Sequence, residues 1–133
     1  MDKELLKKAV SFAKKARDNA YAPYSNFKVG AAVVTKNGKI FTGCNVENAS
    51  YGLTICAERV AIFKAVSEGE RDISSIVVVT DINPPSAPCG ACRQVIREFG
   101  KEIEVIMTNL EGDMIVKPLS ELLPLDFGPE DLI

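Results

Sequence analysis

Apolar residues recur at intervals of three and four over residues 3–20, and lysine or arginine occupies many of the positions between them. This period predicts an amphipathic helix whose charged side faces solvent. Proline within residues 21–25 disfavours helical backbone geometry and ends the helix there. Two β-rich runs follow at 27–35 and 40–45, joined by the polar turn 36–39. The pattern therefore predicts a helix followed by a β-hairpin.

Residues 56–68 predict a second helix, with Thr54 as its N-cap and apolar side chains on most of its sides. A helix that is apolar all round is buried. Because one small sheet covers only one side of such a helix, we expect the other side to contact a second subunit. Residues 73–80 contain a β-branched run at 76–79, which is typical of a strand covered on both faces in a parallel sheet.

The rest of the chain alternates short apolar runs with turn residues. The run after Cys89 predicts a helix because it ends at a glycine, a common residue just past a helix C-terminus. Later runs are short and β-rich, or follow a proline. The expected elements are a loop at 81–87, a helix at 89–99, strands at 104–108 and 114–116, and a short helix at 119–123.

Two irregular segments remain. Residues 43–52 form a polar loop after the hairpin, and such a loop either holds a ligand or simply turns the chain through its asparagines and glycines. Residues 124–133 are acidic and contain proline, but the tail keeps Phe127, Leu132 and Ile133. We therefore expect the tail to dock on the fold.

Length and charge narrow the class of protein. A chain of 133 residues is most economically one domain, 1–133, with a core large enough to need no disulfides. The net charge is −2, and the lysine and arginine residues are scattered along the sequence rather than clustered. This distribution argues against nucleic-acid binding and favours a small-molecule partner. The sequence has no apolar run of membrane-spanning length and no signal-peptide pattern, so we expect a cytoplasmic protein without membrane contact.

The candidate chemistry lies in Cys56-Ala57-Glu58-Arg59 and in the C-x-x-C pair Cys89 and Cys92. The chain has four cysteines and no histidine, so a soft-metal site must be built from thiolates. Zinc accepts tetrahedral sulfur ligands without redox activity. Three protein ligands and a water are the pattern of a catalytic zinc site, because the fourth position stays open.

Two other readings of the C-x-x-C pair stay open from the residues alone. Structural zinc knuckles and thioredoxin-like redox pairs carry the same spacing. A closed structural site wants a fourth thiolate, and Cys44 is the remaining cysteine, at the end of a predicted strand. We expect Cys44 to be a buried apolar residue instead. A redox pair gives no role to Cys56 and Glu58.

The predicted thiols lie at the starts of two helices, where the helix dipole and backbone N–H groups favour thiolates. Glu58 follows Cys56 by two residues, so it can face a water at the site without being a ligand, as a general base must. Arg59 and Arg93 are adjacent cations that can offset the charge of three thiolates. For Arg93, a solvated surface position is an equally good interpretation.

These residues together resemble the cytidine deaminase family in its small, homotetrameric, three-cysteine form. Cys56-Ala57-Glu58 and Pro88-Cys89-Gly90-Ala91-Cys92 match its zinc signature, with cysteine where other branches carry histidine. Asn45-Val46-Glu47-Asn48 matches its nucleoside-binding loop. The resemblance runs from residues 21–25 to the Phe127 region. It implies a three-layer α/β/α fold with a mixed sheet of about five strands.

The resemblance also implies a reaction, a cofactor and roles for individual residues. It implies hydrolysis of cytidine and 2′-deoxycytidine to uridine and 2′-deoxyuridine with release of ammonia, in pyrimidine salvage, by a homotetramer with one Zn²⁺ per chain. Glu58 is then the catalytic acid and base, and Arg59 offsets charge. The metal ligands are Cys56, Cys89 and Cys92, and the substrate-binding residues are Phe27, Asn45, Glu47, Tyr51, Ala57 and Phe127, the last of them reaching a neighbouring subunit.

Two alternatives accompany this interpretation. A related deaminase acting on a modified cytosine nucleoside such as blasticidin S would share the zinc signature, although Asn45 and Glu47 favour plain nucleosides. A structural zinc domain that mediates assembly would keep its fold without any need for Glu58.

Overall fold

The computed structural model describes residues 1–132, so Ile133, the last residue of the predicted tail, lies outside the described residues. Asp2 is the N-cap of helix α1 (Lys3–Arg17), and its carboxylate accepts a hydrogen bond from Leu5 N at 2.7 Å. The predicted extension of this helix to Ala20 was wrong. Backbone N–H groups of residues 18–20 bond to carbonyls three residues earlier, so the chain tightens into turns after Arg17.

The predicted hairpin is confirmed, and its strands are shorter than expected. Strands β1 (Gly30–Thr35) and β2 (Ile40–Cys44) pair antiparallel. Residues 27–29 were predicted as strand but lie outside β1. They are held by the Asn45 side chain, which accepts a hydrogen bond from Val29 N at 2.9 Å and donates one to Phe27 O at 2.8 Å. A side chain thus replaces the strand ladder at this end.

Residues 1–132 form a five-stranded sheet in the order β2-β1-β3-β4-β5. Strand β3 (Ile73–Thr80) pairs antiparallel with β1 and parallel with β4 (Glu104–Asn109), and β4 pairs antiparallel with β5 (Met114–Pro118). The parallel arrangement expected from the β-branched run therefore holds for the β3–β4 pair. The sheet as a whole is mixed, as the family resemblance implied.

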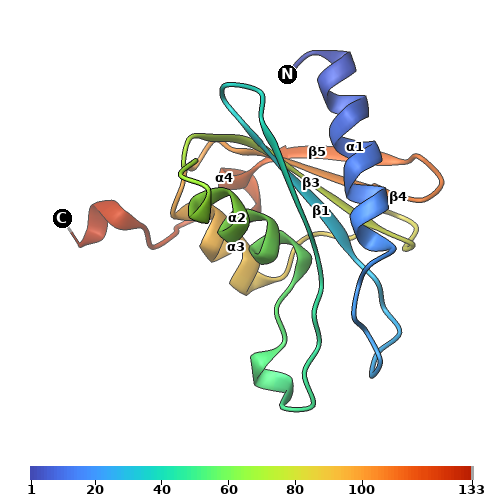
Figure 1. The fold of residues 1–133 in the computed structure, drawn as a ribbon. Helices are drawn as coiled ribbons and strands as arrows, with labels where there is room; N and C mark the ends of the chain where they lie inside the picture. Colours follow the sequence, from blue (N-terminus) through green and yellow to red (C-terminus); the bar gives the residue numbers. More distant parts are fainter. Residues whose placement is uncertain (133) are drawn as a thin grey trace.

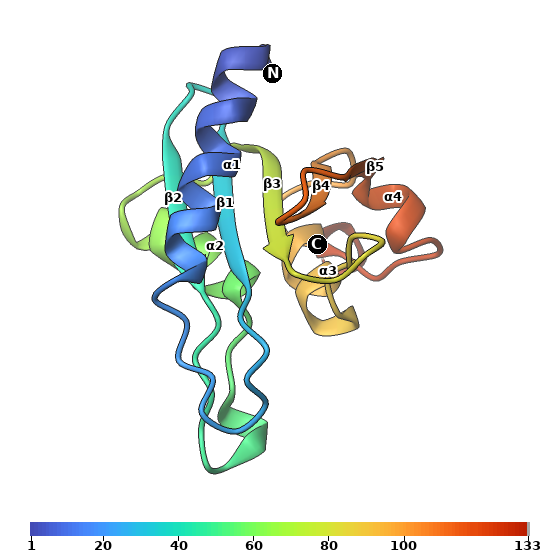
Figure 2. The ribbon, with the colours of Figure 1, turned by 90° about the vertical axis from the view of Figure 1, so that its right-hand side faces the viewer.

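Helices cover both faces of this sheet (Figures 1 and 2). Helix α1 packs Ala9 and Ala13 against one face, together with Val77 and Val79 of β3. The helices on the other face are α2 (Ala57–Ser67), α3 (Gly90–Arg97) and the short α4 (Leu119–Leu122). Alternate residues of β3 thus enter separate cores, which confirms the three-layer α/β/α architecture.

Helix α2 lies directly on β2 because Gly43 has no side chain. A Cβ at Gly43 would meet the backbone nitrogen of Ala61 at 2.5 Å, so another residue there would push the helix away. The cap predicted at Thr54 was wrong, since Cys56 is the N-cap residue and the Thr54 hydroxyl accepts a hydrogen bond from Asn48 N at 3.1 Å. One side of α2 is buried, but Phe63 on the other side is 49 % exposed.

The C-terminal tail is docked on α3 as expected, but not through its apolar residues, because Phe127 is 56 % and Leu132 78 % exposed. The Arg97 side chain is only 3 % exposed and pairs with the carboxylates of Asp126 and Glu130. Gln94 Nε2 donates a hydrogen bond to Phe127 O at 2.8 Å. The polar contacts, more than the apolar ones, therefore fix the path of the tail. Within residues 1–132 no helix combines the length and apolar character needed to cross a membrane.

Candidate active site

Three thiols meet where the N-termini of α2 and α3 converge. Cys56 is the N-cap of α2, Cys89 is the N-cap of α3, and Cys92 lies in the first turn of α3. Their Sγ atoms lie within 4.8 Å of one another. The Cys56–Cys89 separation is 3.8 Å and the Cys89–Cys92 separation is 3.5 Å. The sequence placed both motifs at helix starts, and the fold brings these two starts together.

The spacing of these sulfur atoms fits a zinc ion. Tetrahedral zinc with Zn–S bonds of about 2.3 Å requires sulfur ligands about 3.8 Å apart. Two of the three sulfur pairs lie close to this value, at 3.8 and 3.5 Å, and all three sulfur atoms lie within 4.8 Å of one another. Cys44 is half-buried at the last position of β2, not fully buried as expected, and it does not belong to the cluster found within residues 1–132. The donor set within residues 1–132 is therefore the three thiol groups of Cys56, Cys89 and Cys92.

The surroundings of Cys56 favour its thiolate. The pKa of the Cys56 thiol falls to about 5, chiefly through the neighbouring Cys92 thiol and also through Arg59. Arg59 Nη2 donates to Cys56 Sγ at 3.4 Å. Arg59 Nε is buried and has no hydrogen-bond partner within the described chain. Arg59 thus supplies positive charge directly at the thiol cluster.

Arg93 has a different environment from Arg59. Its Nε donates to Pro88 O at 2.9 Å and its Nη1 donates to Leu122 O at 2.7 Å. The side chain is half-buried, so it is neither the solvated arginine nor the thiolate partner that the sequence allowed. Arg93 instead ties the loop before Cys89 to the end of α4.

Glu58 lies in the first turn of α2 and is only 4 % exposed. Burial raises the pKa of its carboxyl to about 7, and the charge of the Cys56 thiolate acts in the same direction. A carboxyl group that titrates near neutral pH can both accept and return a proton. The side chain borders the same cavity as Cys56 and Cys89.

A cavity of about 350 Å³ opens in front of the thiols. This volume lies within the range of small-molecule sites. Cys56, Glu58 and Cys89 line the cavity together with residues from the segment before β1, the polar loop 43–52, the end of β3 and the loop that follows β3. The predicted substrate-binding residues that line it are Phe27, Asn45, Glu47 and Ala57.

Two predicted substrate-binding residues lie away from this cavity. Tyr51 is 74 % exposed in the 3-10 turn η1 (Tyr51–Leu53) and forms an edge-to-face contact with Tyr24, with ring centroids 6.0 Å apart. Phe127 is 56 % exposed and lies in the tail next to α3. Neither side chain lines the cavity of its own chain as the structure describes it.

The sequence interpretation missed several polar groups. Thr54, Thr80 and Ser86 line the cavity, although they had been assigned to a cap, a strand and a loop. Their signal was weak because hydroxyl residues are common in all three settings.

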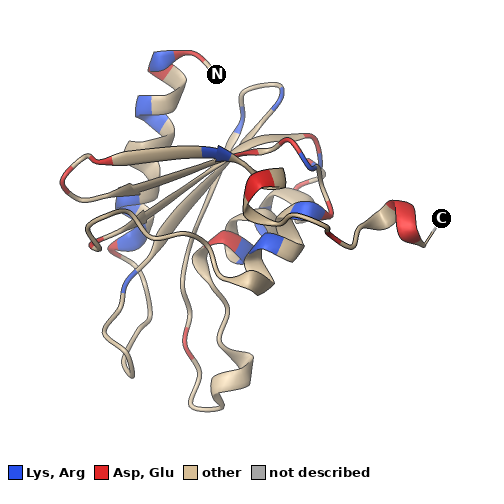
Figure 3. Cartoon of the chain, turned by 180° about the vertical axis from the view of Figure 1, so that it is seen from behind, with Lys and Arg blue, Asp and Glu red and all other residues tan. Residues whose placement is uncertain are grey.

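Charged side chains gather away from the cavity. Basic residues lie along α1, and acidic residues lie in the C-terminal turn η2 (Pro129–Asp131) (Figure 3). None of the cavity-lining residues within 1–132 is Lys or Arg.

The fold and the thiol cluster define an α/β/α domain with a three-cysteine zinc site. Comparison with known proteins identifies which such domain it is. Residues 3–108 match the family model described as the cytidine and deoxycytidylate deaminase zinc-binding region. The chain therefore belongs to the cytidine and deoxycytidylate deaminase family, as its zinc signature suggested.

Individual relatives agree over nearly the whole chain. The cytidine deaminase of Sporosarcina psychrophila is 50% identical over 128 residues, which cover 96% of this chain and 94% of that protein. The cytidine deaminase of Halalkalibacterium halodurans is 52% identical, with coverage of 99% and 98%. The crystal structure of cytidine deaminase from Burkholderia pseudomallei superposes with a TM-score of 0.89 at 54% identity, covering 96% of this chain and 100% of that one.

Proposed function

We propose that this protein is a zinc-dependent cytidine deaminase that hydrolyses cytidine and 2′-deoxycytidine to uridine and 2′-deoxyuridine. The observation that carries the proposal is the buried Glu58 beside three convergent thiols at the end of a cavity of about 350 Å³. Membership of the deaminase family supports the same reaction. Cys56, Cys89 and Cys92 hold one zinc ion per chain.

Glu58 carries the proton transfers of this reaction. Bound zinc supplies Lewis acidity that makes water nucleophilic near neutral pH. Glu58 accepts a proton from the attacking water as the water oxygen bonds to C4 of cytosine, and it delivers that proton to N3. A second proton, from the added hydroxyl group, passes through Glu58 to the exocyclic amine. The C4–N4 bond then breaks, and ammonia and uridine leave.

The cavity walls hold the nucleoside. Phe27 packs beside the base, and the Ala57 backbone at the start of α2 reads the pyrimidine edge. Asn45 and Glu47 receive the ribose. Asn45 keeps capacity for this role because its amide carries two N–H donors and only one is used, on Phe27 O. Arg59 offsets the charge of the thiolates through its contact with Cys56.

We predict that free nucleosides are substrates and polynucleotides are not. If Glu47 accepts a hydrogen bond from the 3′-hydroxyl, a 3′-phosphate brings a like charge and no donor. A site built to bind a hydroxyl group rejects the analogue lacking it by roughly 10⁴-fold, so 3′-deoxycytidine should react slowly and 2′-deoxycytidine well. The absence of Lys and Arg from the described cavity lining agrees with this selectivity.

One ammonia-release assay measures this preference. It compares cytidine, 2′-deoxycytidine, 3′-deoxycytidine and a cytosine-containing single-stranded oligonucleotide at equal zinc content. Glu47→Ala should raise KM and lower kcat/KM for cytidine while zinc remains bound. Equal rates on the oligonucleotide and on cytidine would remove Glu47 from sugar recognition.

We also infer that the protein is a homotetramer with α2 near the subunit interfaces. Phe63 on the outer side of α2 is exposed in one chain, as are apolar residues of the projecting loops such as Tyr21, Tyr24 and Leu53. Several large apolar side chains exposed on one chain are typical of a protein–protein interface. The exposed Phe127 is free to reach a neighbouring subunit's cavity, and the exposed Tyr51 lies against Tyr24 in the projecting loops.

Sedimentation equilibrium tests the assembly. We predict a tetramer at micromolar concentration, and Phe63→Lys should shift the distribution towards smaller species because a charge would be buried in the interface. Lys64→Ala, at an exposed neighbouring position, is the matched control. A fully active monomer would contradict the inference.

The proposed compartment is the cytoplasm, where reducing conditions keep the thiols free for metal. Pyrimidine salvage is the process that such a reaction serves. The direct test of the proposed activity is incubation with cytidine, followed by the ultraviolet change as uridine forms. Blasticidin S is measured in parallel, and a rate on blasticidin S far above that on cytidine would favour the modified-nucleoside alternative. A zinc-containing protein inactive on both would favour the structural zinc domain.

A further inference from the structure

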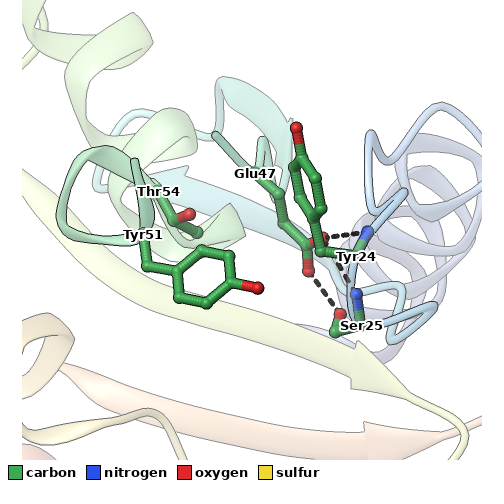
Figure 4. A pocket seen from close by; sticks show the side chains of 5 residues that line it. All are labelled: Tyr24, Ser25, Glu47, Tyr51 and Thr54. Atoms are coloured by element: carbon green, nitrogen blue, oxygen red, sulfur yellow. Dashed lines mark hydrogen bonds between the residues drawn. The ribbon is translucent and has the colours of Figure 1, made fainter. Parts of the chain in front are cut away.

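The Glu47 carboxylate is held by one short loop through three hydrogen bonds (Figure 4). Glu47 Oε1 accepts from the backbone nitrogens of Tyr24 and Ser25, at 2.9 and 3.1 Å. Glu47 Oε2 accepts from the Ser25 hydroxyl. The pKa of the Glu47 carboxyl is lowered, chiefly by this hydroxyl. Glu47 therefore stays ionised and oriented before any ligand arrives.

The Ser25 hydroxyl also fixes the other wall of the cavity. Ser25 Oγ accepts a hydrogen bond from Phe27 N at 3.0 Å while donating to Glu47. Asn26, between them, has a φ of 59°, a left-handed conformation that asparagine tolerates, and its nitrogen bonds to Ala22 O at 3.0 Å. One hydroxyl group thus connects Glu47 and Phe27, which both line the cavity.

Ser25 itself does not line the reaction cavity. It borders an adjoining pocket of about 380 Å³ together with Tyr24, Glu47, Tyr51 and Thr54. Glu47 lies between the two spaces and lines both. Ser25 therefore contacts Glu47 from the adjoining pocket and does not line the cavity in which the cytosine reacts.

Counting acceptor sites shows which carboxylate oxygen remains free. A carboxylate offers about four lone-pair sites, two on each oxygen. The two backbone N–H groups occupy Oε1, and the Ser25 hydroxyl occupies one site of Oε2. One acceptor site remains, and it is on Oε2.

We propose that Ser25 is a positioning residue that presents Glu47 Oε2 to the 3′-hydroxyl of the nucleoside. The proposal rests on the proposed deaminase function and on sugar binding by Glu47. Without the Ser25 hydroxyl, the carboxylate turns about its bonds to Tyr24 and Ser25 nitrogen, and Phe27 N loses its partner. The free acceptor site then no longer has a fixed direction.

The test compares Ser25→Ala with Ser25→Thr, which restores the hydroxyl, and with Ser11→Ala on the exposed side of α1 as the control. The readouts are kcat and KM for cytidine and 3′-deoxycytidine, thermal unfolding and zinc content. Ser25→Ala should lower kcat/KM for cytidine about tenfold, mainly through KM, because a hydrogen bond to a charged group has been removed. The loss on 3′-deoxycytidine should be no more than about twofold, because that substrate lacks the 3′-hydroxyl and is affected only through the lost Phe27 N hydrogen bond. Ser25→Thr should recover most of the loss.

Four results would overturn the proposal. Equal losses on both nucleosides in Ser25→Ala would assign Ser25 a merely structural role, and unchanged kinetics would assign it none. A Ser25→Thr protein as impaired as Ser25→Ala would show that the hydroxyl is not the active feature. If Ser25→Ala does not fold, Ser25→Cys takes its place, because a thiol keeps the size of the side chain but donates a weak hydrogen bond. Ser25→Cys should show the same selective loss on cytidine, and a variant without that loss would contradict the proposal. A wild-type protein that does not deaminate cytidine would defeat the proposed function itself, a result separate from the variant comparison.

Discussion

Glu58→Gln is expected to bind zinc and fold normally but to lose at least roughly 10²–10⁴-fold in kcat, the usual contribution of one positioned acid or base. The loss should lie at the upper end or beyond, because the same carboxyl serves several transfers in the proposed reaction. The amide matches the carboxyl in shape, and it can neither accept the proton of water nor return it. Steady-state kinetics with cytidine, together with zinc analysis of the same sample, measure the effect.

The matched control for this variant is Glu68→Gln. Glu68 is exposed at the C-terminal end of the same helix α2, so its variant removes one negative charge far from the cavity. We expect Glu68→Gln to retain wild-type kinetics. Ordinary turnover by Glu58→Gln would assign the proton transfers to another group.

Replacement of any one ligand cysteine should remove zinc and stability together. In Cys56→Ala, Cys89→Ala or Cys92→Ala, two thiolates remain in the described cluster, and metal binding is coupled to folding in such sites. We expect zinc to fall from one ion per chain to a small fraction. The thermal midpoint should fall by roughly 3–6 °C for each kcal/mol of binding energy that folding loses.

Cys44→Ser separates a three-ligand site from a closed one. Cys44 is half-buried at the end of β2 and lies outside the cluster of the other three thiols. The variant should keep one zinc per chain and full activity. Loss of zinc in Cys44→Ser would mean a fourth thiolate and a closed structural site, which has no position for a reacting water. Metal analysis of the variant after gel filtration distinguishes these two outcomes.

Patterns over a few consecutive residues predicted the elements that such patterns define, namely strands and the starts of helices. The β-branched residues 76–79 predicted a strand covered on both faces, and Val77 and Val78 indeed point into separate cores. The two cysteine motifs lay at predicted helix starts, where Cys56 and Cys89 are the N-caps. Periodicity is a local property, so the sequence alone was sufficient for these elements, although it placed the cap of α2 at Thr54, two residues before Cys56.

Features that depend on partners distant in sequence were not predictable in the same way. The end of β1 is set by Asn45, which bonds to the backbone of Phe27 and Val29 from another strand end. Ser25 and Glu47 are separated by 22 positions and meet only after the two loops fold together. The spacing of apolar residues along a helix or a strand carries no information about such contacts. Polar residues of loops therefore acquire their roles from the tertiary structure, even where motifs name the principal chemistry.

The central claim is that a single zinc ion at the three cysteines, with Glu58, deaminates cytidine. A titration of the metal-free protein with zinc tests it most directly, with the initial rate of uridine formation and the bound zinc measured at each point. The rate should rise in proportion to bound zinc and level off at one ion per chain, with ammonia and uridine released in equal amounts. No uridine at one bound zinc per chain, or full activity without zinc, would contradict the account.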